Sequence, residues 1–189
     1  IFFNGQDITR RSAAQVARMG MVRSFQISAV FPHLTARENL LVPLQRASGA
    51  SYHFWRSQRQ IDRRLDERAL QLLDEVDLGG FADVVAAELP YGRRRALELA
   101  TTLAVSPEVL LLDEPTSGMG HEDIGRVTEL IRRVARRRTV LMVEHNLGLV
   151  ANLSDRITVL QQRSLLAEGS YAEVSRDARV MEAYMGKAA

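Results

Sequence analysis

Short apolar runs alternate with longer amphipathic stretches in the C-terminal half of the chain. The runs are residues 109–112, 139–143 and 157–160. Continuous apolar strands that alternate with helices are what a parallel sheet needs when both of its faces are covered. We therefore expect an α/β layer with a mostly parallel sheet, formed by residues 1–32 and 105–189.

Shorter strand and helix patterns near the N-terminus fit the same α/β layer. Residues 1–3 predict the end of a strand, which the turn residues Asn4 and Gly5 close. Residues 21–25 predict a further strand, which follows a short helix that ends at Gly20.

Residues 33–104 predict a helical lobe inserted into this layer. Thr35 and Glu38 have the spacing of a capping box, so a helix should begin there. Further along, apolar and small residues recur at helical spacing, at Ile61, Leu65, Ala69, Leu72 and Val76. This stripe is too short for a coiled coil and predicts one amphipathic helix that lies on a core.

The composition narrows the class of protein. The 189 residues are 46% hydrophobic and 25% charged, with 25 basic and 23 acidic side chains, as in a globular protein. The sequence contains no cysteine, which excludes disulfide scaffolds, cysteine-ligated zinc and iron–sulfur clusters. No apolar run approaches the roughly 20 residues that span a bilayer, and no signal peptide is visible, so a cytoplasmic location is expected.

The strongest chemical signal follows the strand at 109–112. This strand leads directly into Asp113 and Glu114, and parallel sheets bind ligands at the carboxyl ends of their strands. Asp113 is suited to hold Mg²⁺ through its water shell. Glu114 can polarise a water for in-line attack on a γ-phosphate. Taken alone, the pattern also fits a strand followed by an acidic turn.

Two further segments support a nucleotide site. The strand at 139–143 is followed by His145, which could reach a γ-phosphate oxygen, although a lone histidine there is more often structural. Upstream, Pro90 is expected just inside the start of a helix, and Gly92 is expected to let the backbone approach a ligand closely. The free N–H groups of this helix start would form an anion site.

In order and spacing, these residues resemble the ATPase subunits of ABC transporters over essentially the whole chain. The resemblance implies a P-loop NTPase-type fold that binds ATP and Mg²⁺ and couples hydrolysis to transport. It implies catalytic roles for Glu114, His145 and Gln26, and Mg²⁺ binding by Asp113 and Gln26. The residues that it assigns to ATP bound by a second subunit are Leu89, Pro90, Tyr91, Gly92 and Arg93 in the signature segment, with Ser117 and Gly118 in the D-loop.

Three segments look like ATPases of branched-chain amino-acid importers, namely residues 17–26, 31–40 and 180–186. This likeness implies a dimer with a second ABC ATPase subunit, transmembrane permease subunits and, indirectly, a periplasmic solute-binding protein. It also implies a peripheral position on the inner face of the cell membrane. Urea or amide import is the nearest alternative, because the nucleotide domain does not contact the transported solute.

The sequence departs from the family pattern at several points. The phosphate-binding loop Gly-x-x-x-x-Gly-Lys-[Ser/Thr] is absent, and the only lysine is Lys187. We therefore expect the chain to lack the first strands and this loop at its N-terminal side, and residues 1–189 to be inactive as an ATPase. Pro90, Arg93 and Gly120 replace the usual serine, glutamine and D-loop acid or amide. A degenerate, non-hydrolysing subunit is the alternative, against which the intact Glu114 and His145 argue.

Two residue clusters have competing interpretations. An arginine cluster at 132–138 could bind nucleic acid, but the net charge of only +2 favours a solvated helix end and no nucleic-acid partner. The aromatic residues at 52–55 could contact the permease subunit or pack locally, and we favour local packing. ABC ATPases of DNA repair or chromosome organisation insert long coiled coils or zinc modules, and this sequence has neither.

Overall fold

The computed structural model describes residues 1–24, 30–48 and 58–185. The chain divides into two compact units, Ile1–Val143 and Glu144–Ala189. Gln26, the aromatic residues at 52–55 and Lys187 lie outside the described residues, so what the sequence predicts for them stays a prediction.

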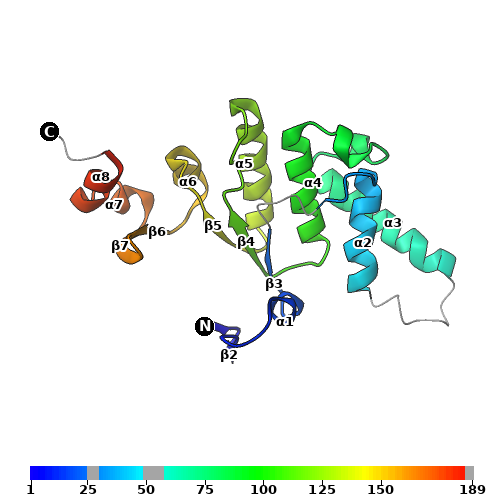
Figure 1. Ribbon diagram of the computed structural model, residues 1–189, viewed down its shortest axis with the longest axis horizontal. Coiled ribbons are helices and arrows are strands. Elements are labelled where there is room, and N and C mark those ends of the chain that lie inside the picture. Colours follow the sequence, from blue (N-terminus) through cyan, green and yellow to red (C-terminus); the bar gives the residue numbers. More distant parts are fainter. Residues whose placement is uncertain (25–29, 49–57, 186–189) are drawn as a thin grey trace. The chain divides into compact units, whose positions relative to one another are not determined.

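The first unit contains a three-stranded parallel sheet (Figure 1). The strand order is β3 (Met21–Arg23), β4 (Val109–Asp113) and β5 (Thr139–Val143). Leu110 and Leu112 of β4 are buried on one face of this sheet. On the opposite face, Leu141 and Val143 of β5 are 62% and 60% exposed, so the expected cover on both faces is not found for these described residues. The α/β fold class with a parallel sheet is nevertheless confirmed.

Helix α5 (His121–Ala135) packs with α4 (Tyr91–Leu103) beside β4. The buried residues of α5 recur at helical spacing, at Val127, Leu130, Ile131 and Val134. At its C-terminal end, Arg132 pairs with Glu129 and Arg133 with Asp77. These pairs favour the interpretation of the arginine cluster as a solvated helix end.

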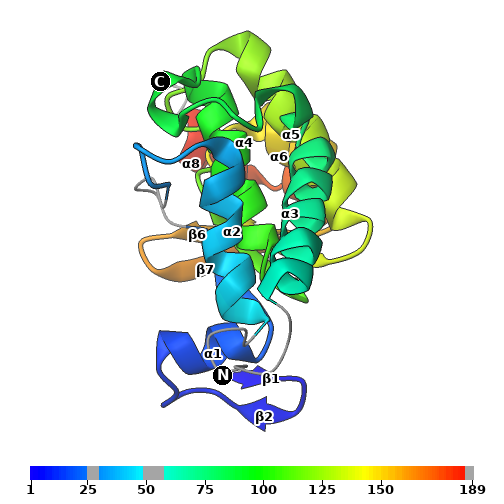
Figure 2. The same cartoon turned by 90° about the vertical axis from the view of Figure 1, so that its right-hand side faces the viewer.

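Three helices pack together in the middle of the chain, α2 (Ala36–Ala47), α3 (Gln58–Glu75) and α4 (Figure 2). Their shared core contains Leu40, Leu72, Leu73 and Leu97. The predicted capping box is present, because Thr35 accepts from the Glu38 N–H and Glu38 accepts from the Thr35 N–H. Two short 3-10 helices, η2 (Gly79–Phe81) and η3 (Ala86–Glu88), connect α3 to α4. That residues 33–104 form a lobe of their own stays a prediction.

The N-terminal residues form a small hairpin. Strand β1 (Phe2–Phe3) pairs antiparallel with β2 (Gln6–Asp7). Asn4 and Gly5 join them with φ values of 48° and 75°, which are the backbone conformations of a type I′ hairpin turn. The turn was predicted, and the partner strand β2 was not. Helix α1 (Ala13–Arg18) follows, with Ser12 and Gln15 forming a capping box.

In the second unit, a short helix precedes a hairpin and two further helices. Helix α6 (Leu147–Leu153) leads to β6 (Ile157–Gln161), which pairs antiparallel with β7 (Ser164–Gly169). Helices α7 (Tyr171–Val174) and α8 (Ala178–Met185) complete the unit, whose core contains Val159, Ala167, Val174 and Val180.

This hairpin corrects one expectation about the sheet. Residues 157–160 were expected to join the parallel sheet, but among the described residues β6 pairs only with β7. Gln162 and Arg163 have φ values of 49° and 67°, so the chain reverses in two residues and the next strand returns antiparallel. Across the described ranges, none of the helices combines the length and apolar character that crossing a membrane would need.

Candidate functional site

The site predicted from the sequence centres on the last residue of β4, Asp113. Its Oδ2 lies 2.6 Å from Nη2 of Arg23, the last residue of the neighbouring strand β3. The Asp113 side chain is 24% exposed, so it remains accessible at the carboxyl end of the sheet. This ion pair joins the ends of the two adjacent strands, and its Arg23 side chain is 57% exposed.

Glu114 has an unusual backbone conformation. Its φ is +44°, in the left-handed region that costs a non-glycine residue on the order of 1–3 kcal/mol unless the surroundings impose it. Its N–H donates to the Val143 carbonyl oxygen over 2.9 Å. Its own carbonyl oxygen accepts from the Ser117 N–H over 3.1 Å and from Nη2 of Arg95 over 3.4 Å. Contacts on both sides of the peptide unit therefore hold Glu114 in this bend.

The signature segment and the D-loop contact each other. Tyr91 is the first residue of α4, and its hydroxyl donates to the Ser117 carbonyl oxygen over 3.1 Å. Gly118 follows with φ +75°, and a Cβ there would lie 3.5 Å from the Tyr91 hydroxyl oxygen. The structure thus brings together two segments that the sequence predicted to contact ATP.

The start of α4 differs in detail from the expectation. Pro90 was expected just inside the helix, but it is the N-cap residue, one position earlier, and provides no side-chain cap. Gly92 was expected to let a ligand approach. In the structure, a Cβ on Gly92 would meet the Asp123 carboxylate of α5 at 2.4–2.7 Å. A side chain at this position would therefore have to displace the Asp123 carboxylate, so the open space at Gly92 is taken up within the chain.

The two flanking residues of the signature segment have partners within the chain. Leu89 is buried, so its side chain contributes to the core. The Arg93 guanidinium carbon lies 3.9 Å from the centroid of the Phe81 ring, a cation–π contact with η2. A role of either residue toward ATP stays a prediction.

His145 belongs to the second unit and follows the last residue of β5 by two positions. Its side chain is exposed, and its backbone N–H donates to Oε2 of Glu144 over 3.1 Å. Asn146 then caps α6 by accepting from the Leu149 N–H over 3.1 Å. Because Asp113 and His145 lie in different units, their proximity stays a prediction.

Asp113 offers a carboxylate oxygen, a ligand type that Mg²⁺ accepts, while its Oδ2 is paired with Arg23 in this structure. Mg²⁺ prefers oxygen ligands and is usually held by one or two carboxylates together with phosphates and waters. Across residues 1–24, 30–48 and 58–185, no cluster of three or more His, Cys, Asp or Glu side chains could hold a metal by itself. A single carboxylate at the end of β4 is therefore consistent with an ion that arrives with a nucleotide.

Sequence reasoning missed three side chains that surround this site, Arg23, Arg95 and Glu98. Arg23 could have been found once β3 was placed beside β4, since both strands then end at the same edge. Arg95 and Glu98 are three residues apart on α4, a common helical ion-pair spacing, but nothing in that spacing indicates contact with Glu114.

Comparison with known families agrees with this arrangement. The family model described as ABC transporter matches residues 1–117, and the model described as branched-chain amino acid ATP-binding cassette transporter matches residues 164–189. The chain belongs to the ABC transporter family, as one of its ATP-binding subunits.

Within that family, the similar proteins point to one group. The chain is 34% identical to the high-affinity branched-chain amino acid transport ATP-binding protein BraF of Pseudomonas aeruginosa, over 100% of this chain and 76% of the relative. The Escherichia coli protein LivG, of the same description, has the same identity and coverage. A crystal structure of an ABC-transporter ATP-binding cassette in its ADP conformation matches with a TM-score of 0.79 and 26% identity, over 98% of this chain and 76% of that chain.

Proposed function

We propose that the protein hydrolyses ATP to drive uptake of branched-chain amino acids, from a peripheral position on the cytoplasmic face of the membrane. The observation that carries the hydrolytic part is the pair Asp113 and Glu114 at the end of the central strand β4. The named functions of BraF and LivG support the choice of solute.

Glu114 is the base in this proposal. Its carboxylate accepts a proton from the water that attacks the γ-phosphate, and its fixed backbone directs it there. His145 contacts the γ-phosphate, and Gln26 orients the attacking water. When Mg²⁺ is bound, it neutralises phosphate charge, and Asp113 and Gln26 are the residues that would hold it.

The start of α4 acts on the nucleotide of a second subunit. Its free N–H groups form an anion site, and Ser117 and Gly118 lie beside Tyr91 in the same region. ABC ATPases work as dimers with permease subunits, so closure on ATP and opening after hydrolysis would move the permease. A periplasmic solute-binding protein would deliver the amino acid to that permease.

Pro90 favours one alternative. Proline has neither a hydroxyl nor a backbone N–H to offer a phosphate, so the signature segment has fewer donors than the family pattern. A subunit that binds its partners without hydrolysing ATP is the function that this residue favours.

The test uses a protein that carries a phosphate-binding loop ahead of residue 1, reconstituted with its permease subunits in vesicles. Glu114→Gln should abolish both ATP hydrolysis and leucine uptake. Glu122→Gln is the matched control, because Glu122 is an exposed acid of the same loop-to-helix region that pairs with Arg126. It should leave both activities unchanged.

Three outcomes would count against the proposal. Hydrolysis that Glu114→Gln leaves intact would remove Glu114 as the base. Absence of hydrolysis in the unmodified protein would support the non-hydrolysing alternative. Uptake of urea without uptake of leucine would assign the transporter to the neighbouring solute class. Residues 1–189 alone, which contain no phosphate-loop lysine, are the negative control for ATP hydrolysis.

A further inference from the structure

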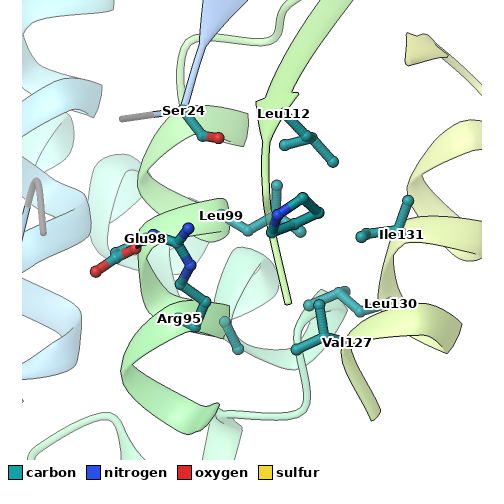
Figure 3. Close-up of a pocket in the computed structure, with 10 residues that line it drawn as sticks. Ser24, Arg95, Glu98, Leu99, Leu112, Val127, Leu130 and Ile131 are labelled. Carbon is teal, nitrogen blue, oxygen red and sulfur yellow. Dashed lines mark hydrogen bonds and ion pairs between the residues drawn. The ribbon is translucent and has the colours of Figure 1, made fainter. Parts of the chain in front are cut away.

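A charged pair lies inside the first unit, between α4 and the end of β4. Nη1 of Arg95 is 2.5 Å from Oε2 of Glu98, and the two side chains are only 11% and 8% exposed. They border a hollow whose other side is apolar, with Leu112 from β4 and Leu130 and Ile131 from α5 (Figure 3). Leaving one charge alone in such surroundings would be costly, so each of the two side chains depends on its partner.

The Arg95 guanidinium also contacts the loop after β4, which contains Glu114. While Nη1 contacts Glu98, Nη2 donates to the carbonyl oxygen of Glu114 over 3.4 Å. The planar guanidinium of an arginine suits this arrangement, because two of its nitrogens can donate hydrogen bonds to two acceptors in fixed directions. Glu98 thus orients Arg95, and Arg95 contacts the backbone of the residue that follows Asp113.

A small displacement of the Glu114 backbone would change the direction of the Glu114 carboxylate. Glu114 is held at φ +44° by bonds from its N–H to Val143 and to its carbonyl oxygen from Ser117 and Arg95. A left-handed glutamate persists only while its surroundings impose that conformation. The direction of the carboxylate depends on it, because the side chain leaves from this same bend.

Arg95 is also linked to the start of α4. It lies four residues after Tyr91, which is one helical turn, on a continuous helix that ends at Leu103. A displacement of the first turn of α4 is therefore carried along the helix to the Arg95 side chain. A second contact between these regions is the hydrogen bond from the Tyr91 hydroxyl to Ser117, a residue of the same loop as Glu114.

We propose that Arg95 is a positioning residue, which couples the first turn of α4 to the orientation of Glu114. The proposal rests on the function proposed above. There, α4 contacts the ATP bound by the second subunit, and Glu114 activates the water that attacks the ATP bound by its own subunit. Contact of α4 with the partner's nucleotide would then set the geometry of the base in the first subunit. In this proposal, Arg95 acts through the backbone of Glu114 and not through direct contact with the nucleotide or the water.

The decisive variant is Arg95→Lys, measured in the protein that carries a phosphate-binding loop. Lysine keeps a cation for Glu98, but its single ammonium group cannot reproduce the fork toward Glu114. We expect kcat for ATP to fall by about tenfold to a hundredfold, the scale of a misplaced catalytic group. KM for ATP and the thermal unfolding midpoint should stay close to those of the unmodified protein. ATP-dependent dimer formation in a Glu114→Gln background should also persist when Arg95→Lys is added.

A paired variant removes both charges without leaving one buried alone. Arg95→Met with Glu98→Met should reproduce the loss in kcat. The matched control is Arg132→Met with Glu129→Met, since this pair has the same three-residue spacing and the same 2.5 Å contact but is exposed on α5. The control should leave kcat unchanged.

The outcomes separate this inference from the proposed function. Normal kcat in both Arg95 variants overturns it, even if Glu114→Gln abolishes hydrolysis. A fall in the unfolding midpoint that accompanies the loss of kcat in Arg95→Lys also overturns it, because the pair would then be structural. Absence of hydrolysis in the unmodified protein, or hydrolysis that survives Glu114→Gln, overturns the proposed function and this inference together.

Discussion

The hydroxyl of Tyr91 donates a hydrogen bond to the carbonyl oxygen of Ser117 over 3.1 Å. The two residues are 26 positions apart, at the start of α4 and in the loop after β4. A Cβ built on Gly118 would lie 3.5 Å from the same hydroxyl oxygen. The signature segment and the D-loop are therefore joined within one subunit before any partner is present.

Removing this hydroxyl should weaken the response to ATP more than the fold. Tyr91→Phe keeps the ring, so the free energy of unfolding should fall by no more than about 1 kcal/mol, the usual net worth of one hydrogen bond. ATP-dependent dimer formation should require several-fold more ATP, because the D-loop loses its tether to α4. Light scattering during an ATP titration measures this. Tyr171→Phe in α7 is the control, and an unchanged titration for Tyr91→Phe would contradict the prediction.

Substitutions of Asp113 and of Glu114 should impair different steps, namely Mg·ATP binding and ATP hydrolysis. Glu114→Gln keeps the shape but removes the base, so ATP should still bind and close the dimer while hydrolysis falls by roughly 10²- to 10⁴-fold. Asp113→Asn weakens the site for Mg²⁺, so Mg·ATP should bind poorly and closure should fail. Gel filtration with ATP distinguishes the two. A dimer trapped by Asp113→Asn and not by Glu114→Gln would reverse the assigned roles.

The packed helices offer a matched test of the core. Leu72 of α3 is 0% exposed, whereas Leu70 on the same helix is 38% exposed. Leu72→Ala should lower the free energy of unfolding by about 2–5 kcal/mol through lost burial and a cavity. Leu70→Ala should change it by about 0.5 kcal/mol or less. Chemical denaturation followed by circular dichroism measures both, and equal effects would contradict this packing.

Asp177 should make the second unit sensitive to acid. Hydrogen bonds from the side chain and backbone of Arg179 lower the pKa of Asp177 from 3.8 to about 2. A carboxylate with a depressed pKa stabilises the folded state above its ordinary pKa, and that contribution is lost as the pH falls through the lowered value. Stability should therefore decrease between pH 3.8 and about 2. Carbon NMR of the carboxyl group gives its pKa, and Asp177→Asn should remove this share of the pH dependence. A titration near 3.8 would contradict the prediction.

The sequence predicted what depends on local pattern. The central strands follow from continuous apolar runs, and the start of α2 follows from Thr35 and Glu38. Likewise, a strand that leads into Asp113 and Glu114 places both residues at the carboxyl end of the sheet, whatever the details of the fold.

Features that depend on contacts between distant segments were not predicted. Gln162 and Arg163 form a two-residue turn without the glycine or asparagine that usually marks one, because strand pairing imposes their conformation. The ion pair between Arg23 and Asp113 requires the strand order, which no short pattern contains. The left-handed Glu114 depends on Val143, Ser117 and Arg95 together, from three separate parts of the chain.

The bend at Glu114 has a consequence for how this position tolerates change. Glycine adopts a positive φ without steric cost, and asparagine adopts it more readily than glutamate, so both relieve backbone strain there. Neither carries a carboxylate that can take a proton from water. In the proposed role of Glu114 as the base, the replacements that suit the fold best are therefore those that would serve hydrolysis least, and selection for stability alone would drive this position away from glutamate.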